Sequence, residues 1–267
     1  MPLSPFAQTL ARPVASPVSR CAVASLIEAF SSLQGEGPYV GRRQLFVRFA
    51  GCHLACAYCD TTLTPDARGM AVTPLADESP SFFVENPLTP EALLSLMRPL
   101  LDAAPHHSVS LTGGEPLLYA DFLRELAPAL SARVPLYLET SGTHVEALAD
   151  ILPWVDIIAM DVKLASATGE PSPFAAHARF LDVARSRPQT RTFIKLVVGP
   201  YPPAEELAAL GAILPARGVP VILQPVTRPD GSLGASAATL MRLQRELSQS
   251  LDDVRVIPQT HKVLGIA

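Results

Sequence analysis

Short apolar runs alternate with helical patterns over most of the chain. Apolar runs that suit buried strands occupy residues 108–111, 136–139, 156–161, 192–198, 219–224 and 254–257. Apolar positions at helical spacing occupy residues 120–132, 144–152, 173–187, 204–216 and 237–248. Repeated strand–helix units predict an α/β fold, with a parallel sheet and helices outside it. We therefore expect a partial (βα)6-type TIM-like barrel, with a doubly wound open sheet as the alternative.

The region before these units predicts an N-terminal β-hairpin. Residues 23–30 and 44–49 are rich in strand-forming residues, and residues 34–38 between them have the composition of a turn. Further along, Thr89 and Pro90 predict the start of a helix, with Thr as the cap and Pro in the first helical position.

The composition is that of a globular protein. The chain has 267 residues, of which 48% are hydrophobic and 17% charged, and its formal net charge is −4. These values exclude a disordered chain. Residues 64–86 have no clear period, so we expect an insert or a loop there. The expected organisation is a flexible extension over residues 1–21 and one barrel domain over residues 22–267.

Two classes of partner are disfavoured by the sequence. No apolar run approaches the roughly 18–20 residues of a membrane span. The mildly acidic balance gives no electrostatic reason to expect nucleic-acid binding. The N-terminal residues lack the continuous apolar segment of a signal peptide. We therefore expect a cytoplasmic protein that binds neither membranes nor nucleic acid.

The distinctive polar motifs all follow predicted strands. They occupy residues 52–60, 112–116, 139–142, 161–163 and 224–227. Functional residues of barrel folds gather where the parallel strands end, because the loops there are free to vary. We expect a single site at this edge of the sheet.

Three of the four cysteines stand close together, as Cys52-x3-Cys56-x2-Cys59. Three thiolates cannot complete a tetrahedral zinc site, so zinc would need His53 or Cys21 as a fourth ligand. A [4Fe-4S] cluster held by three cysteines leaves one iron free to bind a substrate or cofactor. The spacing alone leaves both interpretations open, although we treat Cys21 as incidental.

The cysteine loop, with Tyr58 just before its last cysteine, resembles that of the radical S-adenosylmethionine (SAM) superfamily. Residues 112–116 resemble the Gly-Gly-Glu motif of the same superfamily, in which two glycines let the backbone approach the cofactor. The resemblance implies a [4Fe-4S] cluster whose open iron is chelated by SAM. The implied cluster ligands are Cys52, Cys56 and Cys59. The implied SAM contacts are Gly114, Glu115, Ser141, Lys163 and Gln224.

A closer resemblance is to the 7-carboxy-7-deazaguanine synthases. It rests on residues 33–37, 46–48, 51–52, 59–61 and 257–262. It implies a lyase that contracts 6-carboxy-5,6,7,8-tetrahydropterin to 7-carboxy-7-deazaguanine with loss of ammonia, on the route to queuosine and related deazapurines. The alternatives are another radical SAM enzyme, such as a glycyl-radical activating or peptide-modifying enzyme, and a non-enzymatic iron–sulfur or zinc module.

The same resemblance implies the parts of a substrate site. The implied contacts to the pterin are Leu33, Gln34, Gly35, Arg48, Thr112, Glu139, His261 and Ala267. Thr61 would give a hydroxyl ligand to Mg²⁺, which prefers oxygen donors; alternatively, it only caps its loop. The implied partners are an electron donor such as flavodoxin and a second copy of the chain in a homodimer.

Simpler roles compete with two of these assignments. Arg48 could pair with Glu28 or Glu36 instead of binding a substrate. Glu139 could be a structural hydrogen-bond acceptor. The chain also departs from the family at residues 161–163, where Asp-Val-Lys replaces a Ser-Pro-Lys turn. Of these three residues, the resemblance therefore implies a SAM contact only for Lys163.

Overall fold

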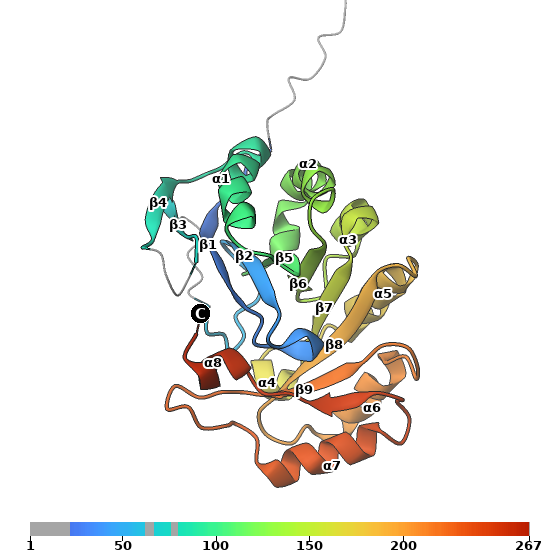
Figure 1. The fold of residues 1–267 in the computed structure, drawn as a ribbon. Helices are drawn as coiled ribbons and strands as arrows, with labels where there is room; N and C mark the ends of the chain where they lie inside the picture. The colour runs from blue at the N-terminus through green and yellow to red at the C-terminus, as the bar shows by residue number, and fades with distance from the viewer. Residues whose placement is uncertain (1–21, 62–66, 76–79, 267) are drawn as a thin grey trace, which may run out of the picture.

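Parallel strands form the centre of the molecule (Figure 1). The computed structural model describes residues 22–61, 67–75 and 80–266. Within them, ten strands form one sheet in the order β10-β9-β8-β7-β6-β5-β2-β1-β3-β4. All neighbouring pairs from β2 to β10 are parallel. The two ends of this order, β10 and β4, do not pair with each other among the described residues, so the barrel is partial.

The elements follow the order that the sequence predicts. The strands are β1 (Leu26–Leu33), β2 (Arg43–Phe49), β3 (Gly69–Thr73), β4 (Phe82–Glu85), β5 (Ser108–Gly113), β6 (Leu136–Thr140), β7 (Ile157–Val162), β8 (Arg191–Val198), β9 (Val221–Pro225) and β10 (Val254–Val256). The helices are α1 (Pro90–Ala103), α2 (Ala120–Ser131), α3 (Val145–Ile151), α4 (Ala165–Thr168), α5 (Phe174–Arg185), α6 (Ala204–Ile213), α7 (Ala237–Leu247) and α8 (Thr260–Leu264). Six strand–helix units lead from β2–α1 to β9–α7, which confirms the predicted fold class.

The predicted N-terminal hairpin is confirmed as β1 and β2. The two strands pair antiparallel, with Leu26 opposite Phe49 and Leu33 opposite Arg43. Strand β1 begins at Leu26, three residues later than the sequence predicts, because Ala24 exchanges backbone hydrogen bonds with Leu88 instead.

The prediction of an insert or loop over residues 64–86 is wrong for two segments. Strand β3 pairs parallel with β1, and β4 pairs antiparallel with β3. Met70 and Val72 of β3 are buried, so this strand does alternate between buried and partly exposed residues. The strand is only five residues long, which is too short for its period to stand out from the surrounding polar residues.

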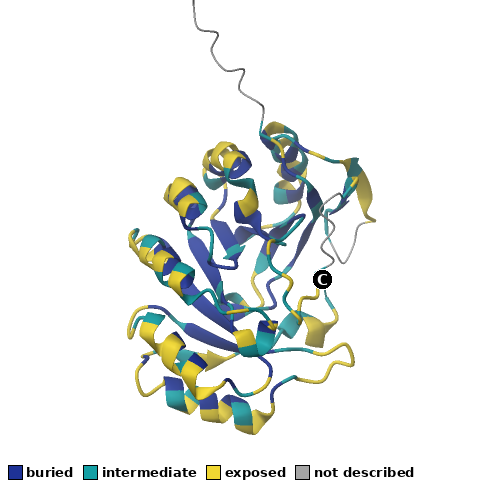
Figure 2. Ribbon diagram, turned by 180° about the vertical axis from the view of Figure 1, so that it is seen from behind, coloured by how far each residue is buried: buried dark blue, intermediate teal, exposed yellow. Residues whose placement is uncertain are grey.

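The helices cover the outer face of the sheet (Figure 2), where their inward sides join the strands in the main hydrophobic core. Helix α1 begins as predicted: the Thr89 side chain accepts a hydrogen bond from the Ala92 N–H, and Pro90 occupies the first turn. Its residues Leu93 and Met97 are fully buried. No helix of the described residues is both long enough and apolar enough to span a bilayer.

The inner face of the sheet is divided into an apolar and a polar half. Tyr137, Ile157, Ala159, Phe193 and Ile222 form a small apolar cluster. Side chains alternate along a strand, so the next inward positions, two residues further on, share this face. On β6, β7, β8 and β9 these positions are polar: Glu139, Asp161, Lys195 and Gln224. The fold therefore places polar side chains inside the barrel, toward the ends of its parallel strands.

Candidate active site

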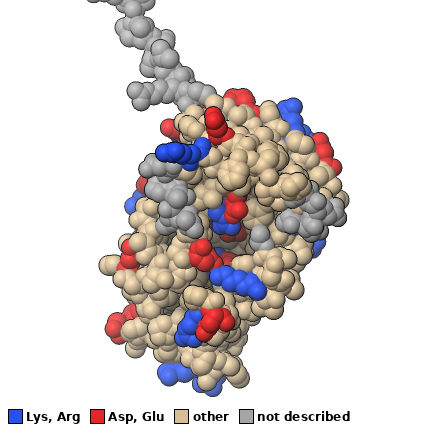
Figure 3. Space-filling model, turned by 90° about the vertical axis from the view of Figure 1, so that its left-hand side faces the viewer, with Lys and Arg blue, Asp and Glu red and all other residues tan. Residues whose placement is uncertain are grey.

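A cavity of about 730 Å³ lies against this polar half of the sheet. It extends from the loop after β1 to the cysteine loop after β2. On this side the molecule is hollowed, and acidic and basic side chains meet in the hollow (Figure 3). The predicted site residues that line the cavity are Leu33, Gln34, Gly35, Arg48, Cys52, Cys56, Cys59, Thr61, Thr112, Gly114, Glu139, Ser141, Lys163, Gln224 and His261. Ala267 and Cys21 lie outside the described residues.

The three clustered cysteines line this one cavity as free thiols. Burial raises the pKa of the Cys52 and Cys56 thiols above the ordinary value. Among the described residues, no three His, Cys, Asp or Glu side chains converge on a point that a single metal ion could occupy. The three thiols lie on one loop that faces the cavity, where they would be available to hold a cluster.

His53 is engaged elsewhere and does not act as a fourth ligand in this arrangement. Its Nε2 lies 3.0 Å from Thr143 Oγ1, and its Nδ1 lies 3.2 Å from His144 Nε2. Both ring nitrogens therefore have partners, and His53 is not among the residues that line the cavity. Among the described residues, His53 and the three thiols do not converge on one metal position.

The glycine turn after β5 packs directly beneath the cysteine loop. A Cβ atom on Gly114 would lie 1.8 Å from the Gly51 carbonyl oxygen and 3.2 Å from the Cys52 nitrogen. The Gly114 N–H donates to the Phe49 carbonyl at 3.0 Å. Only glycine allows this close approach of two backbones. The three thiols and the glycine turn together form a cradle that fits a cluster and a cofactor bound to it.

Glu115 does not line the cavity, which corrects its predicted role as a direct cofactor contact. The residue is fully buried. Its carboxylate accepts hydrogen bonds from the Leu117 N–H, from Thr140 Oγ1 at 2.9 Å and from the Ser141 N–H at 2.8 Å. Its role is to hold the end of β6, where Ser141 faces the cavity. The motif identified the residue, but it did not specify the direction of the side chain.

Glu139, Gln34 and Thr112 are joined by hydrogen bonds beside the cavity. The Glu139 carboxylate accepts from Gln34 Nε2 at 3.0 Å, from Ser110 Oγ at 3.2 Å and from Thr112 Oγ1 at 2.8 Å. Gln34 Nε2 also donates to Gln44 Oε1 at 2.9 Å. A carboxylate has about four acceptor positions, so Glu139 can accept one further N–H. The residue is thus both a structural acceptor and part of the cavity wall.

Arg48 forms the ion pair that the sequence analysis considered as its simpler role. Its Nε lies 2.6 Å from Glu28 Oε1. The guanidinium lies about 6.0 Å from the centre of the Phe30 ring. In the described part of the chain its two terminal nitrogens have no hydrogen-bond partner, and Arg48 lines the cavity. These nitrogens match the fork geometry that binds a carboxylate.

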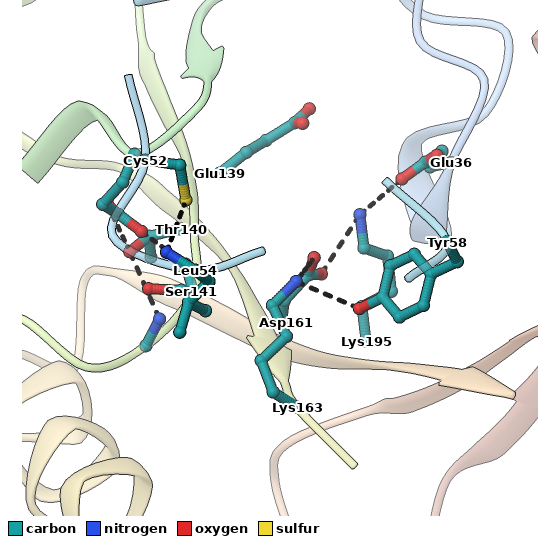
Figure 4. Close-up of polar contacts among 12 residues, drawn as sticks. Glu36, Cys52, Leu54, Tyr58, Glu139, Thr140, Ser141, Asp161, Lys163 and Lys195 are labelled. Carbon is teal, nitrogen blue, oxygen red and sulfur yellow. Dashed lines mark hydrogen bonds and ion pairs between the residues drawn. The ribbon is translucent and has the colours of Figure 1, made fainter. Parts of the chain in front are cut away.

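A chain of alternating charges crosses the cavity wall (Figure 4). Lys195 Nζ lies 2.5 Å from Glu36 Oε2 and 3.1 Å from Asp161 Oδ1. Asp161 Oδ2 in turn accepts from Lys163 Nζ at 2.9 Å, and Lys163 Nζ also donates to Tyr58 Oη at 3.2 Å. This chain connects the loop after β1 with the cysteine loop.

Sequence reasoning assigned no binding role to Glu36, Asp161 or Lys195, although residues 33–37 and 161–163 were among the motifs expected near the site. Glu36 and Lys195 are 159 residues apart, so no local pattern links them. One signal was available. The chain has only three lysines among its 21 basic residues, and all three line the cavity. Asp161 also accounts for the departure at residues 161–163, because it is the acid that bridges two of these lysines.

The C-terminal segment closes one side of the cavity. The Thr260 N–H donates to the Gly35 carbonyl at 2.8 Å. A Cβ atom on Gly35 would lie 2.3 Å from His261 Nδ1, so this glycine leaves room for the histidine. Lys262 Nζ pairs with Asp60 Oδ2 at 2.6 Å. Although burial alone would raise it, this ammonium holds the pKa of Asp60 below its ordinary value.

His177 holds Ser141 from the side opposite Glu115 and gives the fold a pH dependence. Its Nε2 donates to the Ser141 carbonyl at 3.0 Å, and burial lowers its pKa to about 4. In the unfolded chain the imidazole has a pKa of about 6.5, so below this pH the unfolded chain binds a proton that the folded protein does not. Stability contributed by neutral His177 is therefore present above pH 6.5 and is lost as the pH falls toward 4.

We predict that protonation of His177 alone makes the free energy of unfolding about 2 kcal/mol lower at pH 5 than at pH 7. His177→Gln keeps a donor for Ser141 but does not titrate. Urea denaturation at the two pH values checks the prediction, and the variant should lose this part of the pH dependence. Equal pH dependence in both proteins would contradict it.

Comparison with known proteins agrees with this geometry. The model of the Radical SAM superfamily matches residues 46–210. Within the solved structures, QueE from Escherichia coli has a TM-score of 0.58 with 22% identity and covers 90% of this chain and 95% of its own. A radical SAM methyltransferase from Sphaerobacter thermophilus has a TM-score of 0.53 with 16% identity, over 81% of this chain and 66% of its own. Both likenesses concern the fold.

The fold and the cysteine loop thus define a radical SAM enzyme domain. A 7-carboxy-7-deazaguanine synthase of Geobacter sulfurreducens is 39% identical over 246 residues, which cover 91% of this chain and 97% of that protein. One of Archaeoglobus fulgidus is 35% identical over 91% of this chain and 99% of its own. The chain belongs to the 7-carboxy-7-deazaguanine synthase family within the radical SAM superfamily.

Proposed function

We propose that this enzyme contracts the ring of 6-carboxy-5,6,7,8-tetrahydropterin to give 7-carboxy-7-deazaguanine, with loss of ammonia. One observation carries the proposal: a single cavity combines three free thiols and a glycine cradle with a second set of polar groups suited to a pterin. The names of the most similar relatives point to the same product.

The cofactor end of the cavity is built by the loops after β2, β5, β6 and β7 and by the end of β9. A [4Fe-4S] cluster with bound SAM supplies the radical that starts such a reaction. Cys52, Cys56 and Cys59 would hold the cluster. SAM would lie among Gly114, Ser141, Lys163 and Gln224, all of which line the cavity. Gln224 is buried, and its Oε1 has no partner in the described residues, so it can accept a hydrogen bond from a ligand.

The substrate end is built by the loop after β1 and by β2, β5 and β6. Glu139 would accept an N–H of the pterin with its remaining acceptor position. Arg48 would bind the pterin carboxylate with its two terminal nitrogens, in the bidentate geometry that a guanidinium favours. Gln34, Gly35, Thr112 and His261 would complete the walls. These contacts orient the substrate and exclude water from it.

Thr61 is the residue proposed to bind Mg²⁺ together with the substrate. It lines the cavity two residues after Cys59, and an incomplete protein shell that leaves room for substrate oxygens suits this ion. We expect Thr61→Val to raise the Mg²⁺ concentration needed for half-maximal turnover by about tenfold. The control is Thr73→Val, because the hydroxyl of Thr73 contacts the exposed Ser81 and does not line the cavity. An unchanged Mg²⁺ requirement in Thr61→Val would contradict this assignment.

The proposed function is tested by turnover. The chain is reconstituted with iron and sulfide without oxygen and given dithionite, SAM, Mg²⁺ and the carboxytetrahydropterin. Mass spectrometry should detect 7-carboxy-7-deazaguanine. Cleavage of SAM without this product would instead favour another radical SAM activity, such as modification of a peptide. An electron donor such as flavodoxin and a homodimer remain predictions from the resemblance, and the cytoplasmic location remains a prediction from the sequence pattern.

A further inference from the structure

The distribution of lysines singles out Lys195. All three lysines of the chain line the cavity, whereas Arg48 alone does so among the arginines that the structure describes. Lys163 and Lys262 each pair with one carboxylate, but Lys195 pairs with two, Glu36 and Asp161. Its side chain is only 9% exposed. A charge this deeply buried is costly unless it is well paired.

Glu36 is held at both carboxylate oxygens and at its backbone N–H. Lys195 Nζ contacts its Oε2 at 2.5 Å, and Gln259 Nε2 donates to its Oε1 at 2.9 Å. The Glu36 backbone N–H donates to Gln34 Oε1 at 3.0 Å. Each carboxylate oxygen still has acceptor capacity left, and Glu36 lines the cavity beside Gln34 and Gly35.

The ammonium group suits this position better than a guanidinium. Asp161 and Lys195 lie opposite each other on β7 and β8, and Glu36 reaches the same nitrogen from the loop after β1. A compact ammonium with three donors can bridge two carboxylates through one atom, whereas a guanidinium is a rigid planar fork. This explains a lysine here in a chain otherwise rich in arginine.

We propose that Lys195 is a positioning residue: by bridging Glu36 and Asp161, it holds the Glu36 carboxylate in one place at the substrate end of the cavity. The inference rests on the proposed function, because it takes the pterin as the group that Glu36 faces. Lys195 therefore acts on pterin binding through Glu36. It also contacts Asp161, which pairs with the proposed SAM contact Lys163, so its loss should weaken SAM binding less than pterin binding.

Removal of Lys195 has a definite electrostatic consequence. Burial and the nearby Asp161 carboxylate both raise the pKa of Glu36, but Lys195 and the hydrogen bond from Gln259 together lower it, so the pKa lies below its ordinary value. The other titratable groups that face this pair are Tyr137 and Glu139, both on β6. Neither replaces the lost positive charge. Without Lys195, Glu36 takes up a proton at higher pH, and among the described residues its carboxylate keeps only the hydrogen bond from Gln259 to Oε1.

The test measures equilibrium binding of 6-carboxypterin, a fluorescent and unreactive analogue, to the reconstituted chain with SAM and Mg²⁺. We expect Lys195→Met to raise the Kd about tenfold at pH 7.5 and by a larger factor at pH 6. The affinity for SAM should fall by a smaller factor than the affinity for 6-carboxypterin, because Lys163 still pairs with Asp161 in the variant. Arg179→Met removes an exposed ion pair with Glu146 and should change neither affinity. A pterin Kd that is unchanged in Lys195→Met overturns the proposal.

A double-mutant cycle separates positioning from an independent contact. Glu36→Gln should weaken pterin binding by itself, and Lys195→Met should add little to it, because both changes remove the same fixed carboxylate. Additive losses would overturn the proposal. If Lys195→Met does not fold, Lys195→Arg keeps the buried charge; its planar fork should still raise the Kd, by about threefold. An Arg variant that binds as the wild type does would also overturn the proposal.

The proposed function can fail separately from this inference. If the unaltered chain forms no 7-carboxy-7-deazaguanine and does not bind 6-carboxypterin, the proposed function is wrong. If the unaltered chain does both, and Lys195→Met binds 6-carboxypterin with the same Kd and the same pH dependence, only the role of Lys195 is wrong.

Discussion

Cys56→Ala is expected to abolish both the iron–sulfur absorbance near ~400 nm and the cleavage of SAM. Three thiols line the cavity, and each would ligate one iron of the cluster. The two thiols left in the variant cannot hold the cluster. We expect the rate of SAM cleavage to fall by at least about 10³-fold, which corresponds to an increase of about 4 kcal/mol in the activation free energy. Iron and sulfide analysis, absorbance and chromatography of the SAM products check this result.

The fourth cysteine supplies a matched control for this variant. Cys21 lies outside the described residues, and the sequence analysis gives it no role in the site. Cys21→Ala should therefore retain the absorbance and the cleavage of SAM. If Cys56→Ala retained turnover, the assignment of the cysteine loop would be wrong.

Gly114→Ala is expected to have the second largest effect. The added Cβ would lie 1.8 Å from the Gly51 carbonyl oxygen and 2.5 Å from the Gly51 carbonyl carbon, and backbone atoms cannot move aside as a flexible side chain can. The cysteine loop must therefore shift away from the glycine turn. We expect a loss of SAM affinity and of SAM cleavage of about 100-fold, which a displacement of about 1 Å can cause.

Gly211→Ala is the control for Gly114→Ala. Gly211 lies in helix α6 with nothing within 4 Å of an added Cβ, so this change should raise stability by about 0.5–1 kcal/mol and leave activity unchanged. Isothermal titration with SAM and thermal unfolding distinguish the two variants. Wild-type SAM affinity in Gly114→Ala would contradict the proposed cradle.

Much of this architecture could be predicted from residue patterns alone. The apolar runs of β5 to β9 are buried strands in both the sequence pattern and the structure, because their outer face packs against the helices and part of their inner face packs in the small apolar cluster. Polar motifs placed after these strands come together around one cavity, because parallel strands end at one edge of the sheet. Local patterns were enough to predict both features.

Other features depend on contacts that no local pattern contains. Strands β3 and β4 are short, and β3 is held by its pairing with distant β1. The Glu115 side chain turns to the end of β6 because two donors, Thr140 Oγ1 and the Ser141 N–H, lie there, which the motif itself does not encode. Lys195 meets Glu36 only after the barrel is assembled. Only the scarcity of lysine hinted at its importance.

The central claim is that one cavity holds the cluster and the pterin at its two ends. A crystal structure of the reconstituted chain with SAM and 6-carboxypterin, recorded at the iron absorption edge, tests it most directly. We expect anomalous density for iron beside Cys52, Cys56 and Cys59, and the pterin between Arg48 and Glu139. A single metal ion with four protein ligands, or a pterin bound outside this cavity, would contradict the account.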